Sequence, residues 1–381
     1  MLKINNNFFD INQKYLFSEI RQIIRQKKSK NIKLIDMSIG DISLPIDQNI
    51  IKALHKAVDE MGDINNFKGY SPDQGYIFLR ESIKQKYLKL NIKLNLSEIF
   101  ISDGSKSDLS NILEIFSDQN IVGIQSISYP VYYDSCKLGG YQICFIRSCK
   151  ENNFLPSPED IIGPKPDLIY LCSPNNPTGM AYNTEQLKNW VDFALKNNII
   201  IFYDSAYQDF IKQKDIPYTI YQIKDAKNCA IEFCSFSKSA GFTGLRCGYT
   251  IFPDEIILKI NNKNINLNKL WARRQSTKFN GVSYLSQVAA NEFLKNNNNL
   301  KYIKHCDANS KKIIKYLDNN LKQKYWGGVN SPYIWLETKN NLKSKDYFKY
   351  LINNYNIITT PGIGFGKDAE GFVRISNFFN I

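Results

Sequence analysis

Short apolar runs recur through the middle of the chain, and amphipathic segments separate most of them. Runs of this length, bounded by polar turns, are typical of buried strands, whereas segments 105–116 and 183–196 have helical spacing. Strands that alternate with helices in this way predict an α/β domain with a mainly parallel central sheet. The predicted strands are 98–102, 120–126, 141–146, 167–172, 199–204 and 229–234.

The two ends of the chain have a different pattern. After Phe279-Asn-Gly281, helices and strands lead through a glycine-rich loop to a last strand that carries Arg374. We therefore expect a large domain over residues 45–280 and a smaller α+β domain formed by residues 1–44 and 281–381. Outside the strand-rich middle, the predicted helices are 45–61, 76–89, 283–296 and 300–323, with a strand at 331–337.

Composition limits the possible functions. The net charge of +13 could indicate a nucleic-acid partner, but the lysines are spread among Asn and Ile over all 381 residues, which favours a bias in genome composition. With no long apolar run and no signal-like start, we expect a cytoplasmic protein whose eight cysteines are reduced. Only two histidines, His55 and His305, are present, so a histidine metal site or a Ser-His-Asp triad is nearly excluded and no metal is predicted.

One segment combines a lysine with phosphate-binding residue types. Ser235-Phe-Ser-Lys-Ser-Ala-Gly-Phe-Thr-Gly-Leu-Arg246 follows a predicted buried strand. Ser235, Ser237 and Arg246 supply the donors that a phosphate group needs. Lys238 beside them suggests a Schiff base with pyridoxal phosphate (PLP). The alternative is a Ser/Gly loop with a solvated lysine.

Three more motifs follow predicted strands, where the functional loops of a parallel sheet gather. Asp103-Gly-Ser-Lys106 opens a helix and suits an anion, although it could be an ordinary N-cap turn. Ser173-Pro-Asn-Asn-Pro-Thr-Gly179 presents Asn176 on a rigid loop. Asp204, after a very apolar strand, needs a cationic partner such as a protonated pyridine nitrogen, unless it is only a helix cap. All four strand-end features are compatible with one cofactor.

With these motifs, the chain resembles the fold-type I PLP-dependent aminotransferases over essentially its full length. Gly69 to Tyr76, Ser128-Tyr-Pro-Val-Tyr132, Asp204-Ser-Ala-Tyr207 and Phe279-Asn-Gly281 also match. The resemblance implies that Lys238 holds PLP and moves the proton, that Asp204 pairs with the pyridine nitrogen, and that Tyr129 stacks on the ring. The implied cofactor-binding residues are Ser105, Lys106, Tyr129, Asn176, Asp204, Tyr207, Ser235, Ser237, Lys238 and Arg246.

The resemblance further implies a substrate and an assembly. It points to amination of tetrahydrodipicolinate to LL-diaminopimelate with glutamate as donor, in a homodimer with shared active sites. Arg374 would bind the substrate α-carboxylate. Aromatic or histidine-pathway substrates remain alternatives, as does a non-catalytic PLP-binding protein. The implied substrate-binding residues are Tyr15, Gly40, Tyr70, Asp73, Lys106, Tyr129, Asn176, Asn280 and Arg374.

The chain departs from the family in two places. The family has glutamate where this chain has Asp73, a residue expected to contact the distal amine of the substrate. The family also continues past the final strand with a C-terminal helix, whereas this sequence ends at Ile381. We expect the first departure to affect substrate choice and the second to affect packing of the small domain.

Overall fold

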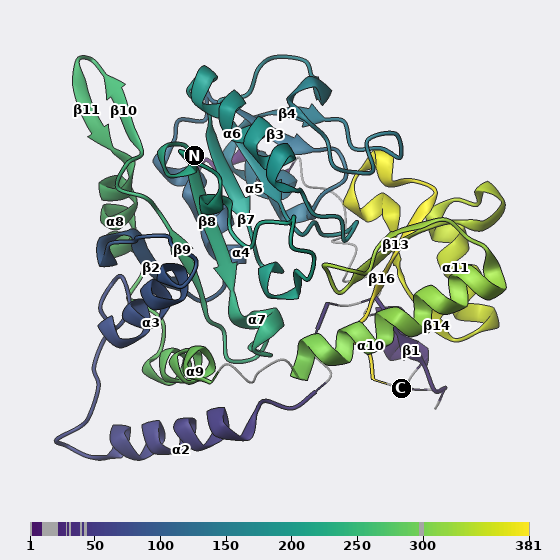
Figure 1. Cartoon of the computed structure of the whole chain (residues 1–381), viewed down its shortest axis with the longest axis horizontal. Helices are drawn as coiled ribbons and strands as arrows, with labels where there is room; N and C mark the ends of the chain where they lie inside the picture. Colours follow the sequence, from purple (N-terminus) through teal and green to yellow (C-terminus); the bar gives the residue numbers. More distant parts are fainter. Residues whose placement is uncertain are drawn as a thin grey trace.

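Two sheets organise the molecule (Figure 1). The computed structural model describes residues 2–9, 22–27, 29, 32–38, 40–41, 44–296 and 301–380. Within these residues, a large mixed sheet has eight strands and a smaller sheet has four.

The large sheet has the strand order β2-β9-β8-β7-β6-β3-β4-β5. Its centre, from β8 to β4, is parallel, whereas β9 pairs antiparallel with both β8 and β2, and β5 pairs antiparallel with β4. All six predicted strands are confirmed; β5 and β9 were not predicted. The strands are β2 (Ile99–Ser102), β3 (Ile121–Gln125), β4 (Gln142–Ile146), β5 (Ile161–Ile162), β6 (Leu168–Cys172), β7 (Ile200–Asp204), β8 (Ala230–Ser235) and β9 (Gly248–Ile251).

Helices cover both faces of this sheet. In β6, Ile169 and Leu171 join one apolar cluster, while Leu168, Tyr170 and Cys172 join the cluster on the other face. Because both faces are buried, the central strands read as continuous apolar runs. Helices α3, α6 and α9 contribute to the first cluster, and α4, α5 and α8 contribute to the second. The helices of this part are α2 (Gln48–Gly62), α3 (Ile77–Leu88), α4 (Ser105–Asn111), α5 (Pro130–Gly139), α6 (Thr184–Asn197), α7 (Phe236–Ser239), α8 (Leu267–Lys278) and α9 (Tyr284–Lys295).

Helix ends follow local capping chemistry. Asn183 accepts a hydrogen bond from the Gln186 amide, and the Gln186 side chain accepts one from the Asn183 amide, so a reciprocal capping box begins α6. The same helix ends at Asn198 in the left-handed conformation. The predicted helix 105–116 is α4 followed by a 3₁₀ segment, η3 (Ile112–Ile115).

The small sheet is antiparallel, in the order β12-β13-β16-β15. Its strands are β12 (Tyr325–Gly327), β13 (Tyr333–Glu337), β15 (Thr360–Pro361) and β16 (Phe372–Ser376). Helix α10 (Lys301–Tyr316), which continues as the π-helical turn η8 (Leu317–Leu321), and helix α11 (Ser344–Asn354) complete this part. Near the N-terminus, β1 (Ile35–Asp36) pairs with β14 (Ile357–Ile358), so residues distant in sequence pack together.

The predicted domain boundaries remain a prediction. The pairing of β1 with β14 associates the N-terminal segment with the small sheet, as expected. Helix α9, which was assigned to the small domain, packs on α2 and α3 beside the large sheet (Figure 1). A boundary after α9 would agree better with this packing than one at residue 280.

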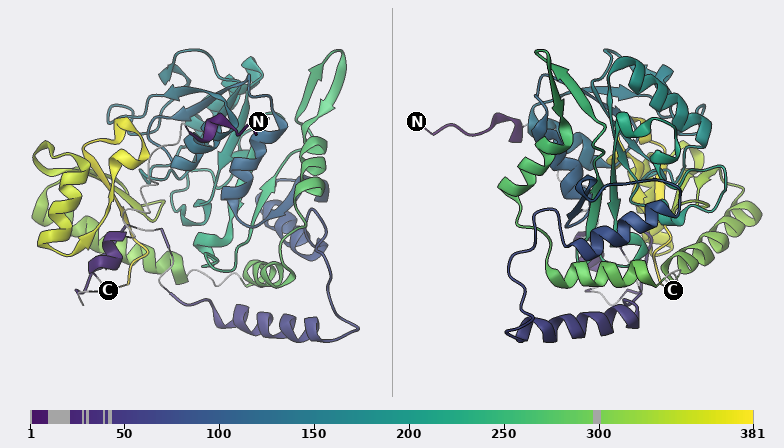
Figure 2. Two further views of the ribbon diagram at one scale, coloured as in Figure 1. Left: turned by 180° about the vertical axis from the view of Figure 1, so that it is seen from behind. Right: turned by 60° about the vertical axis from the view of Figure 1, so that its left-hand side comes forward.

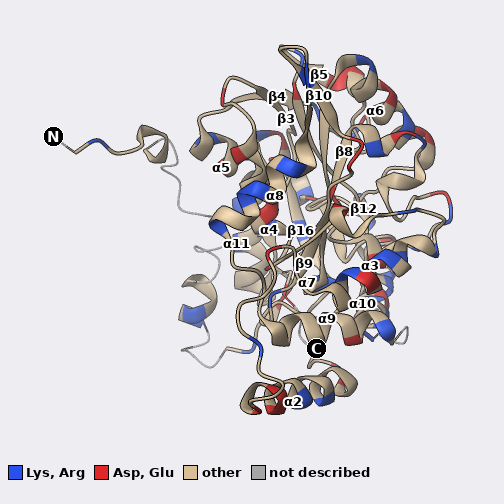
Figure 3. Cartoon of the chain, turned by 90° about the vertical axis from the view of Figure 1, so that its left-hand side faces the viewer, with Lys and Arg blue, Asp and Glu red and all other residues tan. Residues whose placement is uncertain are grey.

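Two segments project from the body. Residues 2–9 extend away from it (Figure 2). Asn7 Nδ2 donates to the Leu138 carbonyl at 3.3 Å. The hairpin of β10 (Ile257–Ile260) and β11 (Lys263–Asn266) projects at another edge. Lys and Arg occur on helices throughout the chain, with acidic residues between them (Figure 3). Among the described residues, no helix combines the length and apolar character that crossing a membrane requires.

Candidate active site

Lys238 lies on the short helix α7, directly after strand β8. The Ser235 side chain accepts a hydrogen bond from the Ser237 amide at 3.2 Å and so begins this helix. The Lys238 ammonium donates to the carbonyl oxygen of Gly40. Burial lowers the pKa of Lys238 to about 8; Asp41 opposes this shift, while Arg374 and Arg246 reinforce it. A measurable fraction of this amine is therefore neutral near pH 7, as attack on an aldehyde requires.

Asp204 ends strand β7 and is 4% exposed. In the described part of the chain, its hydrogen-bond donors are the Tyr132 hydroxyl at 2.5 Å and the Ala206 amide at 3.1 Å, both neutral. Burial raises the pKa of Asp204 to about 6, although the Tyr132 hydrogen bond lowers it. A buried carboxylate held by neutral donors gains most from a cationic ligand group. Tyr132 was not assigned a role from the sequence, although it lies within a matched motif.

Arg374 lies on β16 and joins the two sheets. Its Nη1 donates to Asn176 Oδ1 at 2.6 Å, and its Nη2 donates to the Ser38 carbonyl at 2.6 Å. The side chain is 2% exposed. Asn176, on the loop after β6, is also buried. The structure thus brings the predicted carboxylate-binding arginine to a predicted cofactor-binding asparagine.

Two tyrosines adjoin this pair. The hydroxyl groups of Tyr207 and Tyr333 are 2.8 Å apart. The Tyr333 ring lies 4.4 Å from the Arg374 guanidinium carbon. Tyr207 was predicted from the sequence, whereas Tyr333 and Ser38 were missed because no local motif marks them.

Several predicted phosphate-binding residues lie around Arg246. Arg246 Nη1 donates to Ser237 Oγ at 3.2 Å. A Cβ atom on Gly104, whose φ is +125°, would lie 2.5 Å from Arg246 Nη2, so glycine permits the close approach of α4 to this arginine. Ser105 begins α4 and the exposed Lys106 follows it. Tyr129, half-buried, has its ring 5.7 Å from that of Tyr132.

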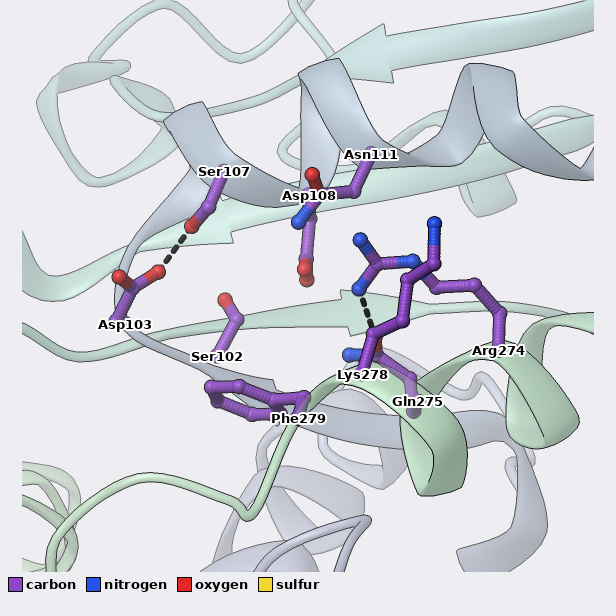
Figure 4. Close-up of a pocket in the computed structure, with 9 residues that line it drawn as sticks. All are labelled: Ser102, Asp103, Ser107, Asp108, Asn111, Arg274, Gln275, Lys278 and Phe279. Carbon is purple, nitrogen blue, oxygen red and sulfur yellow. Dashed lines mark hydrogen bonds between the residues drawn. The ribbon is translucent and has the colours of Figure 1, made fainter.

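A cavity of about 120 Å³ lies between α4 and α8 (Figure 4). Asp108 points into it and accepts a hydrogen bond from Thr250 Oγ1 at 2.6 Å. Burial raises the pKa of Asp108 to about 7, although the hydrogen bond from Thr250 lowers it. Asp108 therefore ties α4 to β9 and fixes the helix that carries Ser105 and Lys106.

Three other predicted substrate residues, Tyr70, Asp73 and Asn280, are exposed. Tyr70, which is 88% exposed, and Asp73 are on the loop between α2 and α3. This loop packs on the segment of the exposed Asn280, since a Cβ atom on Gly281 would lie 2.7 Å from the Cβ of Ser71. Gly40 contacts Lys238, as noted above. Tyr15 lies outside the described residues.

The residues around Lys238 and Asp204 fit a phosphorylated pyridine aldehyde. Lys238 supplies an amine with a lowered pKa, and Asp204 supplies a buried carboxylate without a cation among its hydrogen-bond donors in the described chain. Ser237 and Arg246 supply phosphate donors beside them. These are the three groups that PLP requires at its aldehyde, ring nitrogen and phosphate.

Comparisons with known proteins agree with this geometry. The family model described as aminotransferase class I and II matches residues 32–377. LL-diaminopimelate aminotransferase of Azobacteroides pseudotrichonymphae is 43% identical over 100% of this chain and 96% of its own length. The enzyme of the same name from Methanosphaera stadtmanae is 42% identical over 99% of this chain and 95% of its own length.

Solved structures show the same relationship. The structure of L,L-diaminopimelate aminotransferase from Chlamydomonas reinhardtii has a TM-score of 0.90 and 36% identity, and the match covers 100% of this chain and 95% of that one. Aspartate aminotransferase from Thermus thermophilus with maleate shares the fold, with a TM-score of 0.86 at 19% identity over 100% of this chain and 96% of that one.

Proposed function

The chain belongs to the class I and II aminotransferase family, and from this premise we propose that it forms LL-diaminopimelate from tetrahydrodipicolinate with glutamate as amino donor. The protein is a PLP-dependent enzyme that acts on amino acids and 2-oxo acids. The observation that carries the reaction type is the convergence of three residues. The half-buried Lys238 follows the strand that pairs with the strand of Asp204, and it interacts electrostatically with the buried Arg374. The choice of substrate rests on the full-length similarity to diaminopimelate enzymes.

Lys238 would perform the proton transfers. When bound, PLP supplies an electron sink for the substrate α-carbon. With a pKa of about 8, lowered mainly by burial, the Lys238 amine can bind the aldehyde and later carry a proton at Nζ. Histidine is not needed for this role. Lys238 lies beside Gly40, a predicted substrate-contacting residue, which supports this role.

Asp204 would hold the pyridine nitrogen in its protonated form. Its carboxylate is buried and oriented by Tyr132 and the Ala206 amide, so it would face the nitrogen without rearrangement. Asn176 and Tyr207 would bind the ring oxygen, and Tyr129 would stack on the ring. The phosphate would be held by Ser105, Lys106, Ser235, Ser237 and Arg246.

Arg374 would bind the α-carboxylate of both substrates. Its guanidinium is already oriented by Asn176 and Ser38, and a planar fork matches a carboxylate in two parallel hydrogen bonds. Glutamate would give up its amino group and leave as 2-oxoglutarate. The amino group would then pass to the open, keto form of the acceptor in a second half-reaction.

Residues of a second protomer would bind the end of the substrate that is distant from the reacting amino group. Tyr70, Asp73 and Asn280 are exposed within one protomer. Large apolar side chains are exposed over the same region, which is typical of an interaction surface. This supports a homodimer with shared active sites. The exposed large apolar residues from α2 to Ile77, the first residue of α3, are Val58, Ile64, Phe67, Tyr70 and Ile77.

Half-reaction spectra test the proposal. The PLP-loaded protein is mixed with glutamate, LL-diaminopimelate, an aromatic amino acid or histidinol phosphate, each alone, and the visible absorption band of bound PLP is followed. We expect glutamate and LL-diaminopimelate to remove this band and the other two compounds to leave it. Loss of the band with the aromatic amino acid but not with LL-diaminopimelate would assign another substrate class.

A further inference from the structure

Tyr333 occupies a central position in the candidate site, although no motif identified it. It begins β13, which pairs with β16, the strand of Arg374. The side chain is 1% exposed. Gly179 fits tightly against its backbone, because a Cβ atom on that glycine would lie 2.2 Å from the Tyr333 carbonyl oxygen. The loop that carries Asn176 therefore fixes Tyr333 from the side of the large sheet.

The ring and hydroxyl of Tyr333 face two different predicted functional residues. The ring lies 4.4 Å from the guanidinium carbon of Arg374, within the range of a cation–π contact. The hydroxyl lies 2.8 Å from that of Tyr207, and the two rings meet edge to face at 5.1 Å. Tyr333 therefore contacts both the predicted carboxylate-binding residue and a predicted ring-oxygen ligand.

Because Gly40 has no side chain, the Tyr333 hydroxyl can occupy the space beside it. A Cβ atom on Gly40 would lie 2.2 Å from the Tyr333 hydroxyl oxygen and 3.3 Å from the ring carbon that bears it. The first distance is a clash, whereas the second requires a shift of only a few tenths of an ångström. A glycine at position 40 is thus matched to a hydroxyl at position 333.

We propose that Tyr333 is a positioning residue that couples Arg374 to Tyr207. Its hydroxyl donates to the Tyr207 oxygen, which leaves the Tyr207 proton directed at the ring oxygen of the cofactor. Its ring holds the Arg374 guanidinium in the plane needed for the substrate carboxylate. The inference rests on the proposed function, because it assumes PLP beside Tyr207 and a carboxylate at Arg374.

The variant Tyr333→Phe tests the hydroxyl and keeps the ring. A weaker hydrogen bond from Tyr207 to the ring oxygen should raise the pH midpoint of the visible absorption change of the PLP-loaded protein. A hydrogen bond of ordinary strength corresponds to a rise of about 0.4 to 1 pH unit. The KM for glutamate should stay within about twofold, since the cation–π contact is retained. An unchanged midpoint overturns the hydroxyl role.

The variant Tyr333→Leu tests the ring. Loss of the cation–π contact should raise the KM for glutamate by about 3- to 30-fold relative to Tyr333→Phe, while kcat changes less. A KM equal to that of Tyr333→Phe overturns the ring role. Tyr221→Phe is the matched control, because it removes another buried hydroxyl, bound to the Ala230 and Ile251 carbonyls. It should lower thermal stability without moving the pH midpoint or KM.

A double variant tests the steric match between position 40 and position 333. Gly40→Ala alone should weaken PLP binding, measured by equilibrium dialysis, and adding Tyr333→Phe should restore much of it because the 2.2 Å contact is removed. Additive losses in the double variant overturn the match between the two positions. The pH midpoint and PLP binding need no turnover. They therefore test Tyr333 even if the wild-type protein fails to transaminate glutamate or LL-diaminopimelate, a result that would overturn the proposed function.

Discussion

The Arg374 guanidinium donates to the Asn176 amide oxygen at 2.6 Å, although 198 residues separate the two in the sequence. The arginine lies on the small sheet and the asparagine on a loop of the large sheet. Both side chains are buried, so the bond is protected from water. A substrate carboxylate at Arg374 would therefore engage both parts of the protein at once.

The first prediction concerns this arginine. Arg374→Lys keeps the charge but loses the planar fork that can bind a carboxylate through two hydrogen bonds. One charged hydrogen bond is worth about 1.5–3 kcal/mol, so kcat/KM for glutamate should fall by about 10- to 150-fold. Steady-state kinetics measure this. Arg274→Lys, which alters an arginine paired with Glu114, is the control and should leave kcat/KM nearly unchanged.

Lys238 is predicted to carry the cofactor covalently. Borohydride reduction of the PLP-loaded protein should attach PLP to the peptide that contains Lys238, as read by mass spectrometry. Lys238→Ala should still bind PLP without a covalent bond but lose transamination by several orders of magnitude. Lys212→Ala, which removes a surface lysine paired with Asp307, is the control. Near-normal turnover of Lys238→Ala would contradict the assignment.

Asp204 is predicted to hold the charge of the ring nitrogen. Asp204→Asn keeps a hydrogen-bonding side chain in the same position but cannot stabilise a protonated pyridine. The variant should bind PLP, yet kcat should fall by at least about tenfold, the value of one charged hydrogen bond. Stopped-flow measurement of the glutamate half-reaction checks this. If the rate is unchanged, Asp204 acts only as a cap for the following turn.

The strands that were predicted correctly are those whose burial gives a continuous run of apolar residues. Ile200 to Tyr203 are buried on both faces of the sheet, so every position is apolar. Strand β9 escaped prediction because its four residues begin with Gly248 and follow the phosphate motif directly. The β10–β11 hairpin could have been predicted from the pair Asn261-Asn262. Asparagine tolerates positive φ, and both residues adopt it, as a two-residue hairpin turn requires.

The site residues, too, could be predicted only where the local sequence indicates their position. Lys238, Asp204 and Asn176 follow strands of one sheet, so their convergence could be inferred from topology. Tyr333 and Ser38 reach the site through pairing between distant segments, which no local pattern encodes. Their roles depend on the register of the small sheet and on β1 beside β14.

A buried carboxyl group away from the site predicts an unusual pH dependence. Glu232 on β8 is fully buried and accepts from the Tyr87 hydroxyl at 2.5 Å and from Thr219 Oγ1 at 2.9 Å. Burial raises its pKa to about 7 from 4.5. The folded protein thus binds more protons than the unfolded chain between these values, so this group makes the free energy of unfolding fall as pH rises.

Glu232→Gln removes that contribution. Relative to wild type, the variant should gain stability between pH 4.5 and pH 8 by on the order of 3 kcal/mol at most. Urea unfolding at the two pH values measures it. Glu114→Gln is the control of opposite sign. Burial opposes the shift at Glu114, but hydrogen bonds from Arg274 and Lys278 lower its pKa, so its loss should be felt mainly at higher pH. A parallel pH dependence for Glu232→Gln and wild type would contradict the prediction.

The last prediction concerns Asp73 and the substrate's distal ammonium. Aspartate is shorter than the glutamate of the family by one carbon–carbon bond, about 1.5 Å. The loop of Asp73 is supported by the hydrogen bond from Gln287 to Ser71 at 2.8 Å, and we expect it to bring the carboxylate within reach. Asp73→Ala should lower kcat/KM for LL-diaminopimelate by about 10- to 150-fold, the value of one charged hydrogen bond. Glutamate, which lacks a distal ammonium, should be little affected, and an equal loss for both substrates would make Asp73 structural.

Mixed dimers decide whether Asp73 acts on its own protomer or on its partner. A dimer of one Lys238→Ala protomer and one Asp73→Ala protomer is isolated with two affinity tags. Because Asp73 is exposed in its own protomer, we expect it to serve the partner's site. The lysine of the Asp73→Ala protomer would then work with the intact Asp73 of the other protomer. Activity towards LL-diaminopimelate should therefore be about half that of wild type, as one of two sites is complete. Activity of about half that of the Asp73→Ala homodimer would place Asp73 in its own protomer's site, because only one of the two sites would then retain Lys238.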